Sequence, residues 1–237
     1  MTDTELAALD ASHALHLLRR GDLGALEYAQ ALMRCMHARA GLHAMTHVDA
    51  DAVRHAARLA DDVPAGRRGL LHGLPMVVKD NIDVVGFPCT AGSPALAGHR
   101  PLRDADCVAP LRAAGAVVLG KSNLHEFALG VTSGNAAYGA VRNPHAPGRI
   151  AGGSSGGTAA AVAARLAPVG LGTDTGGSIR IPAALNGIVG FKSTARLVPT
   201  DGALPLSTTL DTVCAMTRSV RDAILAHEVL AQRTVTR

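Results

Sequence analysis

Two clusters of glycine and serine constrain the fold of this chain more than any other feature. The first, GGSSGG, covers residues 152–157, and the second, TDTGGS, covers residues 173–178. Glycine has no side chain to block a close approach to the backbone, so each cluster exposes main-chain N–H groups around a hydroxyl. We therefore expect two loops in which the backbone and a serine act together.

The stretches around these clusters predict an α/β architecture. Helical patterns occupy 104–115 (DADCVAPLRAAG) and 158–167 (TAAAVAARLA). The β-rich runs between them are 74–80 (LPMVVKD), 116–120 (AVVLG), 167–172 (APVGLG) and 187–191 (GIVGF). Strands that alternate with helices favour a sheet covered by helices, with ligands bound in the loops beyond the strand ends.

The first 62 residues are predicted to be helical. The run ELAALDASHALHLLRRG ends at Gly21, Asp22 is expected to cap the next helix, and a third helix is expected after Asp49. We accordingly divide the chain into an N-terminal helical segment, 1–62, that packs on an α/β core, 63–237.

Composition excludes several classes of protein. Of the 237 residues, 48% are hydrophobic and 18% are charged, which excludes a disordered or fibrous chain. Aromatic residues are rare, and the basic residues behind the net charge of +4 are scattered, so we expect no nucleic-acid partner.

The sequence also predicts the compartment and the absence of a metal. The start MTDTELAALD is acidic, unlike a signal peptide, and no apolar run reaches the length of about 18 residues that a membrane span needs. The four cysteines form no CxxC pair. We expect a cytoplasmic protein with reduced thiols, no membrane partner, no metal and no cofactor.

The first cluster precedes a predicted helix, whose unpaired N–H groups favour an anion or an oxyanion. It lacks the Lys-Ser/Thr ending of a phosphate-binding loop and the spacing of a dinucleotide fingerprint. It matches the nucleophile-elbow pattern G-x-S-x-G twice, centred on Ser154 or Ser155, but that fold requires a downstream acid and then a histidine. Of the histidines, only His227 follows, which disfavours the elbow.

The second cluster suggests a different serine chemistry. A hydroxyl among bare backbone N–H groups can attack a carbonyl while those donors hold the developing oxyanion, so Ser178 is a candidate nucleophile. With histidine poorly placed, the base is expected to be a lysine made neutral by burial. Lys79 is that candidate, since it alone of the lysines is expected to follow so buried a strand.

Three segments of the chain resemble the amidase signature family. The segment 152–192 is similar to the defining stretch of the family almost throughout, and 72–96 (HGLPMVVKDNIDVVGFPCTAGSPAL) is similar to its lysine segment. The stretch 115–144 joins the two, and the resemblance runs from about His72 to Arg221. It implies a mixed sheet flanked by helices.

The resemblance also implies a set of catalytic roles. The nucleophile is expected at Ser178, the base at Lys79, and a bridging serine that follows a cis peptide at Ser154. Ser155 is expected to be a structural neighbour of the bridging serine. The remaining implied residues are the oxyanion donors Thr175, Gly176 and Gly177, and Asp174 with Arg180 as braces of the loop.

The resemblance implies an amidase that converts a small carboxamide to a carboxylic acid and ammonia through an acyl-serine. The stretches AAYGAVRNP and RIPAALNGIVG are most similar to hydrolases of indoleacetamide and mandelamide, so an arylacetamide is the preferred substrate. One alternative is the glutaminase subunit of a tRNA-dependent amidotransferase, and another is a non-catalytic remnant.

Members of this family are considerably longer than this chain. On that ground we expect the 237-residue chain alone to be oligomeric or poorly soluble, with weak activity at best.

Overall fold

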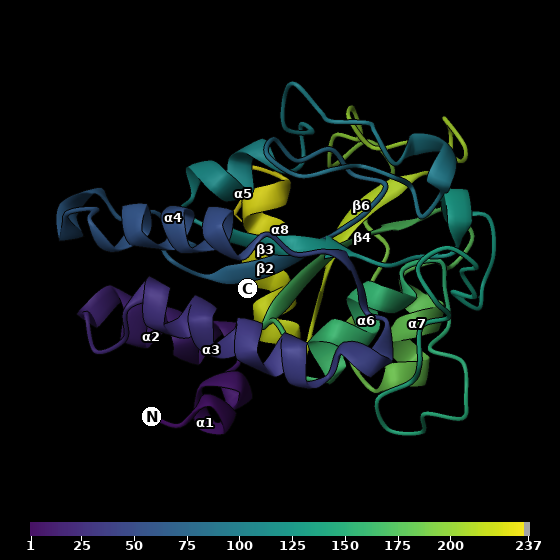
Figure 1. The fold of residues 1–237 in the computed structure, drawn as a ribbon. Helices are drawn as coiled ribbons and strands as arrows, with labels where there is room; N and C mark the ends of the chain where they lie inside the picture. The colour runs from purple at the N-terminus through teal and green to yellow at the C-terminus, as the bar shows by residue number, and fades with distance from the viewer. Residues whose placement is uncertain (235–237) are drawn as a thin grey trace.

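The computed structural model describes residues 1–234 and contains one mixed sheet of six strands in the order β1-β3-β2-β4-β6-β5 (Figure 1). The strands β3, β2 and β4 are parallel, whereas β1 at one edge and β6 and β5 at the other run antiparallel to their neighbours. The strand bounds are Met45–His47 (β1), Pro75–Lys79 (β2), Val117–Ser122 (β3), Val169–Asp174 (β4), Val189–Gly190 (β5) and Thr212–Thr217 (β6). The expected α/β class with a mixed sheet is confirmed.

Helices cover the sheet, with α1 to α4 gathered at one end and α6 and α7 beside the other (Figure 1). The α-helices are Asp3–Ala8 (α1), Ala11–Arg20 (α2), Ala25–Ala38 (α3), Ala50–Asp61 (α4), Ala109–Ala113 (α5), Gly156–Ala163 (α6), Arg180–Asn186 (α7) and Val220–Leu230 (α8). Single 3-10 turns occur at Ala40–Leu42, Ala65–Arg67, Pro94–Leu96 and Glu126–Ala128. Within residues 1–234, no helix has both the length and the apolar character needed to cross a membrane.

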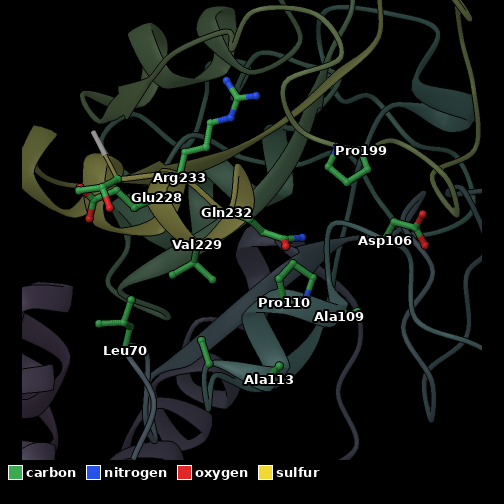
Figure 2. Close-up of a pocket in the computed structure, with 12 residues that line it drawn as sticks. Leu70, Asp106, Ala109, Pro110, Ala113, Pro199, Glu228, Val229, Gln232 and Arg233 are labelled. Atoms are coloured by element: carbon green, nitrogen blue, oxygen red, sulfur yellow. The ribbon is translucent and has the colours of Figure 1, made fainter. Parts of the chain in front are cut away.

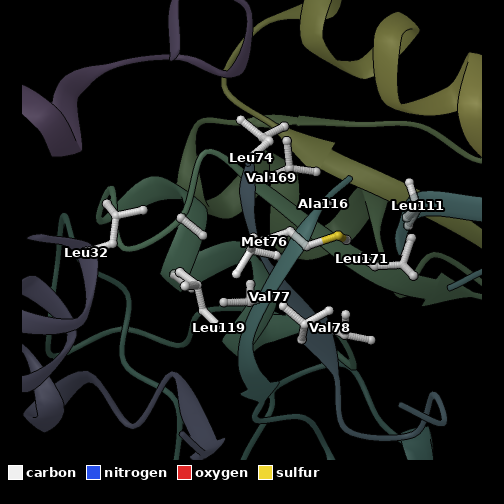
Figure 3. Packing of buried hydrophobic residues seen from close by; sticks show 14 of the residues in the cluster. Leu32, Leu74, Met76, Val77, Val78, Leu111, Ala116, Leu119, Val169 and Leu171 are labelled. Atoms are coloured by element: carbon white, nitrogen blue, oxygen red, sulfur yellow. The ribbon is translucent and has the colours of Figure 1, made fainter. Parts of the chain in front are cut away.

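The core is aliphatic and is centred on the parallel strands. Every residue of β2, β3, β4 and β6 is buried, as expected for strands that helices cover on both faces. Figure 3 shows Met76, Val77 and Val78 of β2 packed among leucine and valine side chains from neighbouring elements. This packing leaves the lysine at the end of β2 inside the protein.

The N-terminal region departs from the expected three helices in two ways. The first predicted helix is divided into α1 and α2, because Asp10 accepts a hydrogen bond from the amide of His13 and caps a new helix. The region also contributes the edge strand β1, which pairs with β3. The division at residue 62 remains a prediction, although β1 ties 1–62 to the sheet of the core.

The cap of α3 is not the one that the sequence predicts. Asp22 lies outside the helix and bonds Arg20, while the N-cap residue is Gly24, which has no side chain to offer. The amides of Ala25 and Leu26 instead donate to the carboxylate of Asp61 at the end of α4, at 2.6 and 3.0 Å. A residue distant in sequence thus supplies the cap, which explains why local pattern misassigned it.

We expect Asp61→Ala to lower the free energy of unfolding by about 1 kcal/mol, because two amides of the first turn of α3 lose their acceptor. Asp22→Ala is the matched control and should cost less than about 0.5 kcal/mol, since it removes only a surface pair. Urea denaturation of both variants measures the difference. A larger loss of unfolding free energy in Asp22→Ala than in Asp61→Ala would show that Asp22, and not Asp61, caps α3.

Candidate active site

The two glycine clusters meet where parallel strands end. Lys79 is the last residue of β2, and Thr173 and Asp174 are the last two of β4. Because β2 and β4 are adjacent and parallel, their carboxyl ends lie at the same edge of the sheet. The loop 151–155, which leads into α6, reaches the same place and brings Ser154 to Lys79.

The loop before α6 is held in position by the segment after β3. The peptide bond between Gly153 and Ser154 is cis, and the carbonyl oxygen of Ser154 accepts hydrogen bonds from His125 N at 3.1 Å and Ser133 Oγ at 3.2 Å. At Gly157, an added Cβ would lie only 2.3 Å from the carbonyl oxygen of Asn123. The glycines of this cluster therefore permit contact between two backbone segments.

Lys79 is completely buried, and every hydrogen bond from its amine to the described residues goes to a hydroxyl group. Its Nζ lies 2.7 Å from Ser154 Oγ and 2.7 Å from Thr173 Oγ1. Burial lowers the pKa of Lys79 to about 7, against the opposing effect of the carboxylates of Asp174 and Asp211. The amine can therefore be neutral near physiological pH and accept a proton from a hydroxyl group.

The main chain of Ser178 is hydrogen-bonded to Ser155, the residue next to Ser154. The amide of Ser155 donates to the carbonyl oxygen of Ser178 at 3.0 Å, which fixes the second cluster next to the first. The Ser178 residue is 8% exposed, and its hydroxyl makes no hydrogen bond to the described residues. The Ser178 hydroxyl is not sealed inside the protein, so solvent reaches it.

Asp174 organises the loop that carries Ser178. Its carboxylate accepts hydrogen bonds from the amides of Gly177 and Ile179 at 2.9 and 3.0 Å and pairs with Arg180 at 3.0 Å. Burial opposes ionisation, but the Arg180 guanidinium and the amides of Ile179 and Arg180 hold the pKa of Asp174 below its usual value. The loop needs glycine at Gly177, where φ is +136°.

One of the three amides expected to form an oxyanion hole is already bonded within the loop. The N–H of Gly177 is committed to Asp174. The amides of Thr175, Gly176 and Ser178 have no hydrogen-bond partner within the part of the chain that the structure describes. The available donors are therefore grouped on both sides of Gly177.

A second buried lysine contradicts the expectation that Lys79 alone follows a buried strand. Lys121 in β3 is also fully buried, but its Nζ forms an ion pair with Asp80 at 3.0 Å and donates to the carbonyl oxygen of Pro88. The register aligns Lys121 with Val78 and Ser122 with Lys79, so the two lysine side chains leave the sheet on opposite faces. Lys79 differs in having no carboxylate partner.

The histidine that an elbow mechanism requires is elsewhere. His227 lies on α8, and its ring packs edge-on against Phe191 with the centroids 5.0 Å apart. Among the described residues, no hydrogen bond joins it to Ser154 or Ser155. The structure therefore supplies Ser154 with a lysine and not with a histidine.

Two cavities differ in their relation to this site. A cavity of about 790 Å³ lies between α5 and α8 and is lined by Ala109, Pro110 and Val229 among others (Figure 2). None of the candidate catalytic residues lines it. A smaller cavity of about 360 Å³ is lined by Asn81, Thr173 and Thr175, so it adjoins the partner of Lys79. Lys79, Ser154 and Ser178 do not line the smaller cavity, but Thr173 connects it to the Lys79 amine, so this cavity is the nearer of the two to the candidate site.

A comparison with protein families decides the ancestry of this chain. The model of the family described as Amidase matches residues 28–236. The chain belongs to the amidase family. Its expected resemblance is thereby confirmed over most of its length, and the two glycine clusters lie inside the matched region.

Relatives of this amidase-family chain have different named activities. It is 44% identical over 230 residues to a glutamyl-tRNA(Gln) amidotransferase subunit of Salinispora arenicola. The aligned region covers 96% of this chain and 47% of that protein. It is 52% identical over 161 residues to the indoleacetamide hydrolase of Pseudomonas syringae pv. syringae, covering 68% and 36% of the two chains. The chain spans about half the length of the curated relatives it matches, or less.

Solved structures agree with this assignment of the fold. The native peptide amidase from Stenotrophomonas maltophilia superposes with a TM-score of 0.91 at 41% identity, over 95% of this chain and 48% of that one. The corresponding glutamyl-tRNA(Gln) amidotransferase subunit from Thermotoga maritima superposes with a TM-score of 0.77 at 32% identity, covering 100% and 49% of the two chains.

Sequence reasoning missed the residues that surround Lys79. Thr173 entered only as part of the second cluster, and Asn81, whose Nδ2 lies 3.3 Å from Thr173 Oγ1, was not considered. The Asp80–Lys121 pair was also missed. Adjacent polar residues after two buried strands, KDN at 79–81 and KSN at 121–123, are the signal that could have found them.

Replacing Lys79 should change how stability depends on pH. Between about pH 7 and the ordinary lysine pKa of 10.5, the unfolded chain binds one more proton than the folded chain, so the free energy of unfolding rises with pH. Lys79→Met should remove this rise, which denaturation at several pH values measures. Lys192→Met provides a matched lysine control. Parallel curves for wild type and Lys79→Met would contradict a neutral buried amine.

Proposed function

We propose that this chain is the catalytic part of an amidase that hydrolyses a small carboxamide through an acyl-serine. The observation that carries the proposal is the completely buried Lys79 amine bonded to Ser154, with Ser178 fixed alongside. A neutral amine in contact with a serine can serve as a general base without a histidine. The proposed reaction requires no cofactor and no metal.

In the first half of the reaction, Ser178 Oγ attacks the carbonyl carbon of the amide. The hydroxyl proton of Ser178 passes to Ser154, and Ser154 passes its own proton to Lys79 Nζ. The tetrahedral intermediate then collapses, the C–N bond breaks, and Lys79 returns the proton through Ser154 to the leaving nitrogen. Ammonia departs, and an ester joins the acyl group to Ser178.

In the second half, water attacks the ester carbonyl. Its proton takes the same route to Lys79, and it is returned to Ser178 when the C–O bond breaks. The carboxylic acid is released and the starting protonation is restored. The two half-reactions use one relay in both directions.

The oxyanion of each intermediate is proposed to bind backbone amides of the second cluster. The amides of Thr175 and Gly176 are free to donate, whereas Gly177 must share its N–H with Asp174. Ser155 supports this loop through its Oγ, which donates to the carbonyl oxygen of Thr173 at 3.1 Å. Asp174 and Arg180 brace the loop from the other side.

Two substrate classes remain, and each is favoured by a relative. The match to an indoleacetamide hydrolase supports an arylacetamide, which is our preferred class. The match to a glutamyl-tRNA(Gln) amidotransferase subunit supports the second candidate, a glutaminase that passes ammonia to partner subunits. Both reactions would use the same relay, so the site itself does not distinguish them.

A fluorophosphonate probe tests the nucleophile. We expect the probe to label Ser178, and Ser178→Ala to abolish labelling because the covalent bond forms at that oxygen. Ser154→Ala should slow labelling by roughly 100-fold or more, since the relay is interrupted. Peptide mapping locates the label. A label on Ser154 or Ser155 would overturn the assignment and favour the elbow.

The base is tested by the pH dependence of the labelling rate. Because Lys79 must be neutral, the rate should rise with pH and level off above its pKa of about 7. Lys79→Met should lower the rate by several orders of magnitude, while His227→Ala, on a distant helix, should leave it nearly unchanged. The reverse order of the two variants would refute the lysine mechanism.

Ammonia release distinguishes the substrate classes. We expect the chain to release ammonia from indole-3-acetamide and not from glutamine when it is tested alone. Release from glutamine only after amidotransferase partner subunits are added would support the second candidate. Ser178→Ala serves as the blank in each assay.

A further inference from the structure

The carboxamide of Asn81 lies behind the partner of the proposed base. Asn81 is two residues beyond the end of β2 and is 1% exposed. Its Nδ2 lies 3.3 Å from Thr173 Oγ1, and its Oδ1 has no hydrogen-bond partner among the described residues.

Counting protons shows that the orientation of the Asn81 carboxamide decides whether Lys79 presents an N–H or its lone pair to Ser154. A neutral Lys79 amine has two N–H groups and one lone pair, and Thr173 has one hydroxyl proton. If Asn81 Nδ2 donates to Thr173 and the Thr173 proton stays within this chain of contacts, its acceptor is the lone pair of Lys79. The amine must then donate to Ser154, and it cannot take the proton of that serine.

Exchanging the oxygen and nitrogen of the carboxamide reverses this direction. Such an exchange hardly changes the shape of an asparagine side chain, and the assignment of the two atoms follows from the hydrogen-bond network. With Oδ1 toward Thr173, the hydroxyl of Thr173 donates to Asn81 and its oxygen accepts an N–H from Lys79. The lone pair of Lys79 then faces Ser154.

We propose that Asn81 is a positioning residue that turns its carboxamide oxygen toward Thr173 and so directs the lone pair of Lys79 at Ser154. This inference rests on the proposed lysine mechanism. Asn81 does not touch the reacting atoms, and it acts only through Thr173. The hydrogen-bond chain runs from Ser154 to Lys79, then to Thr173, and ends at Asn81.

The charges near Lys79 do not set this direction. Asp174 is held by Arg180 and by backbone amides, and Asp211 accepts hydrogen bonds from Thr175 Oγ1 and the amides of Leu206 and Ser207. On β3, Lys121 is paired with Asp80 on the opposite face of the sheet. None of these groups contacts Thr173 Oγ1, so within residues 1–234 Asn81 is the group besides Lys79 that is placed to orient that hydroxyl.

The test is the rate at which a fluorophosphonate labels Ser178, measured against pH in the full chain. Asn81→Leu removes both polar atoms and should slow labelling by about 10- to 100-fold at every pH. Asn81→Asp keeps an acceptor and should stay within about threefold of wild type on its plateau. The rise with pH should move to higher pH in this variant, because the added carboxylate stabilises the protonated amine.

A double-mutant cycle tests whether Asn81 acts through Thr173. Thr173→Val should slow labelling about as much as Asn81→Leu, and the two together should be no slower than either one alone. Thr173→Ser should restore most of the rate. The matched control is Thr158→Val, which removes a buried hydroxyl bonded to Ser122 at 2.7 Å and should affect stability without changing the pH profile.

Four results would overturn the inference. Equal slowing by Asn81→Asp and Asn81→Leu would show that the nitrogen faces Thr173 in the working enzyme. Multiplicative effects in the double variant would show that Asn81 does not act through Thr173. Labelling of Ser178 in Asn81→Leu at the wild-type rate would refute the positioning role of Asn81 and leave the lysine mechanism standing. No labelling of Ser178 in wild type would refute the lysine mechanism and the role of Asn81 together.

Discussion

The contact between the Lys79 amine and Ser154 is the interaction on which the rest of the site depends. An ammonium group buried without a carboxylate partner is costly, so burial favours the neutral amine, which is the form that can accept a proton. Lys121 provides the internal comparison, since it is equally buried but is paired with Asp80. The same residue type therefore has two roles, which depend on whether a carboxylate or a hydroxyl faces it.

The glycine clusters bring main chain close to this buried amine while Ser178 keeps 8% of its surface exposed. Gly157 allows the loop before α6 to contact the backbone after β3, which holds Ser154 against the lysine. Gly177 allows the second loop to wrap around Asp174, which leaves Ser178 at the surface of the site. Small residues thus bring two backbone segments close to a fully buried amine.

The structure shows where Lys79, Ser154 and Ser178 lie, whereas the names of the relatives concern the substrate. Lys79, Ser154 and Ser178 all lie within these 237 residues, although the chain spans about half the length of the relatives it matches. The relatives are named for different activities, while the fold that holds Lys79, Ser154 and Ser178 is shared at TM-scores of 0.77 and 0.91. Substrate choice is therefore expected to depend on residues around the relay and not on the relay itself.

The sequence by itself determined the α/β class, the strands β2, β3 and β4, and the two loops that carry Ser154 and Ser178. These features follow from local patterns of apolar residues and glycine. Only the tertiary structure decided that Asp61 caps α3, that Lys121 pairs with Asp80, and that Thr173 and Asn81 stand behind Lys79. Each of these contacts joins side chains whose distance and direction depend on how the strands and helices pack, and no local pattern contains that information.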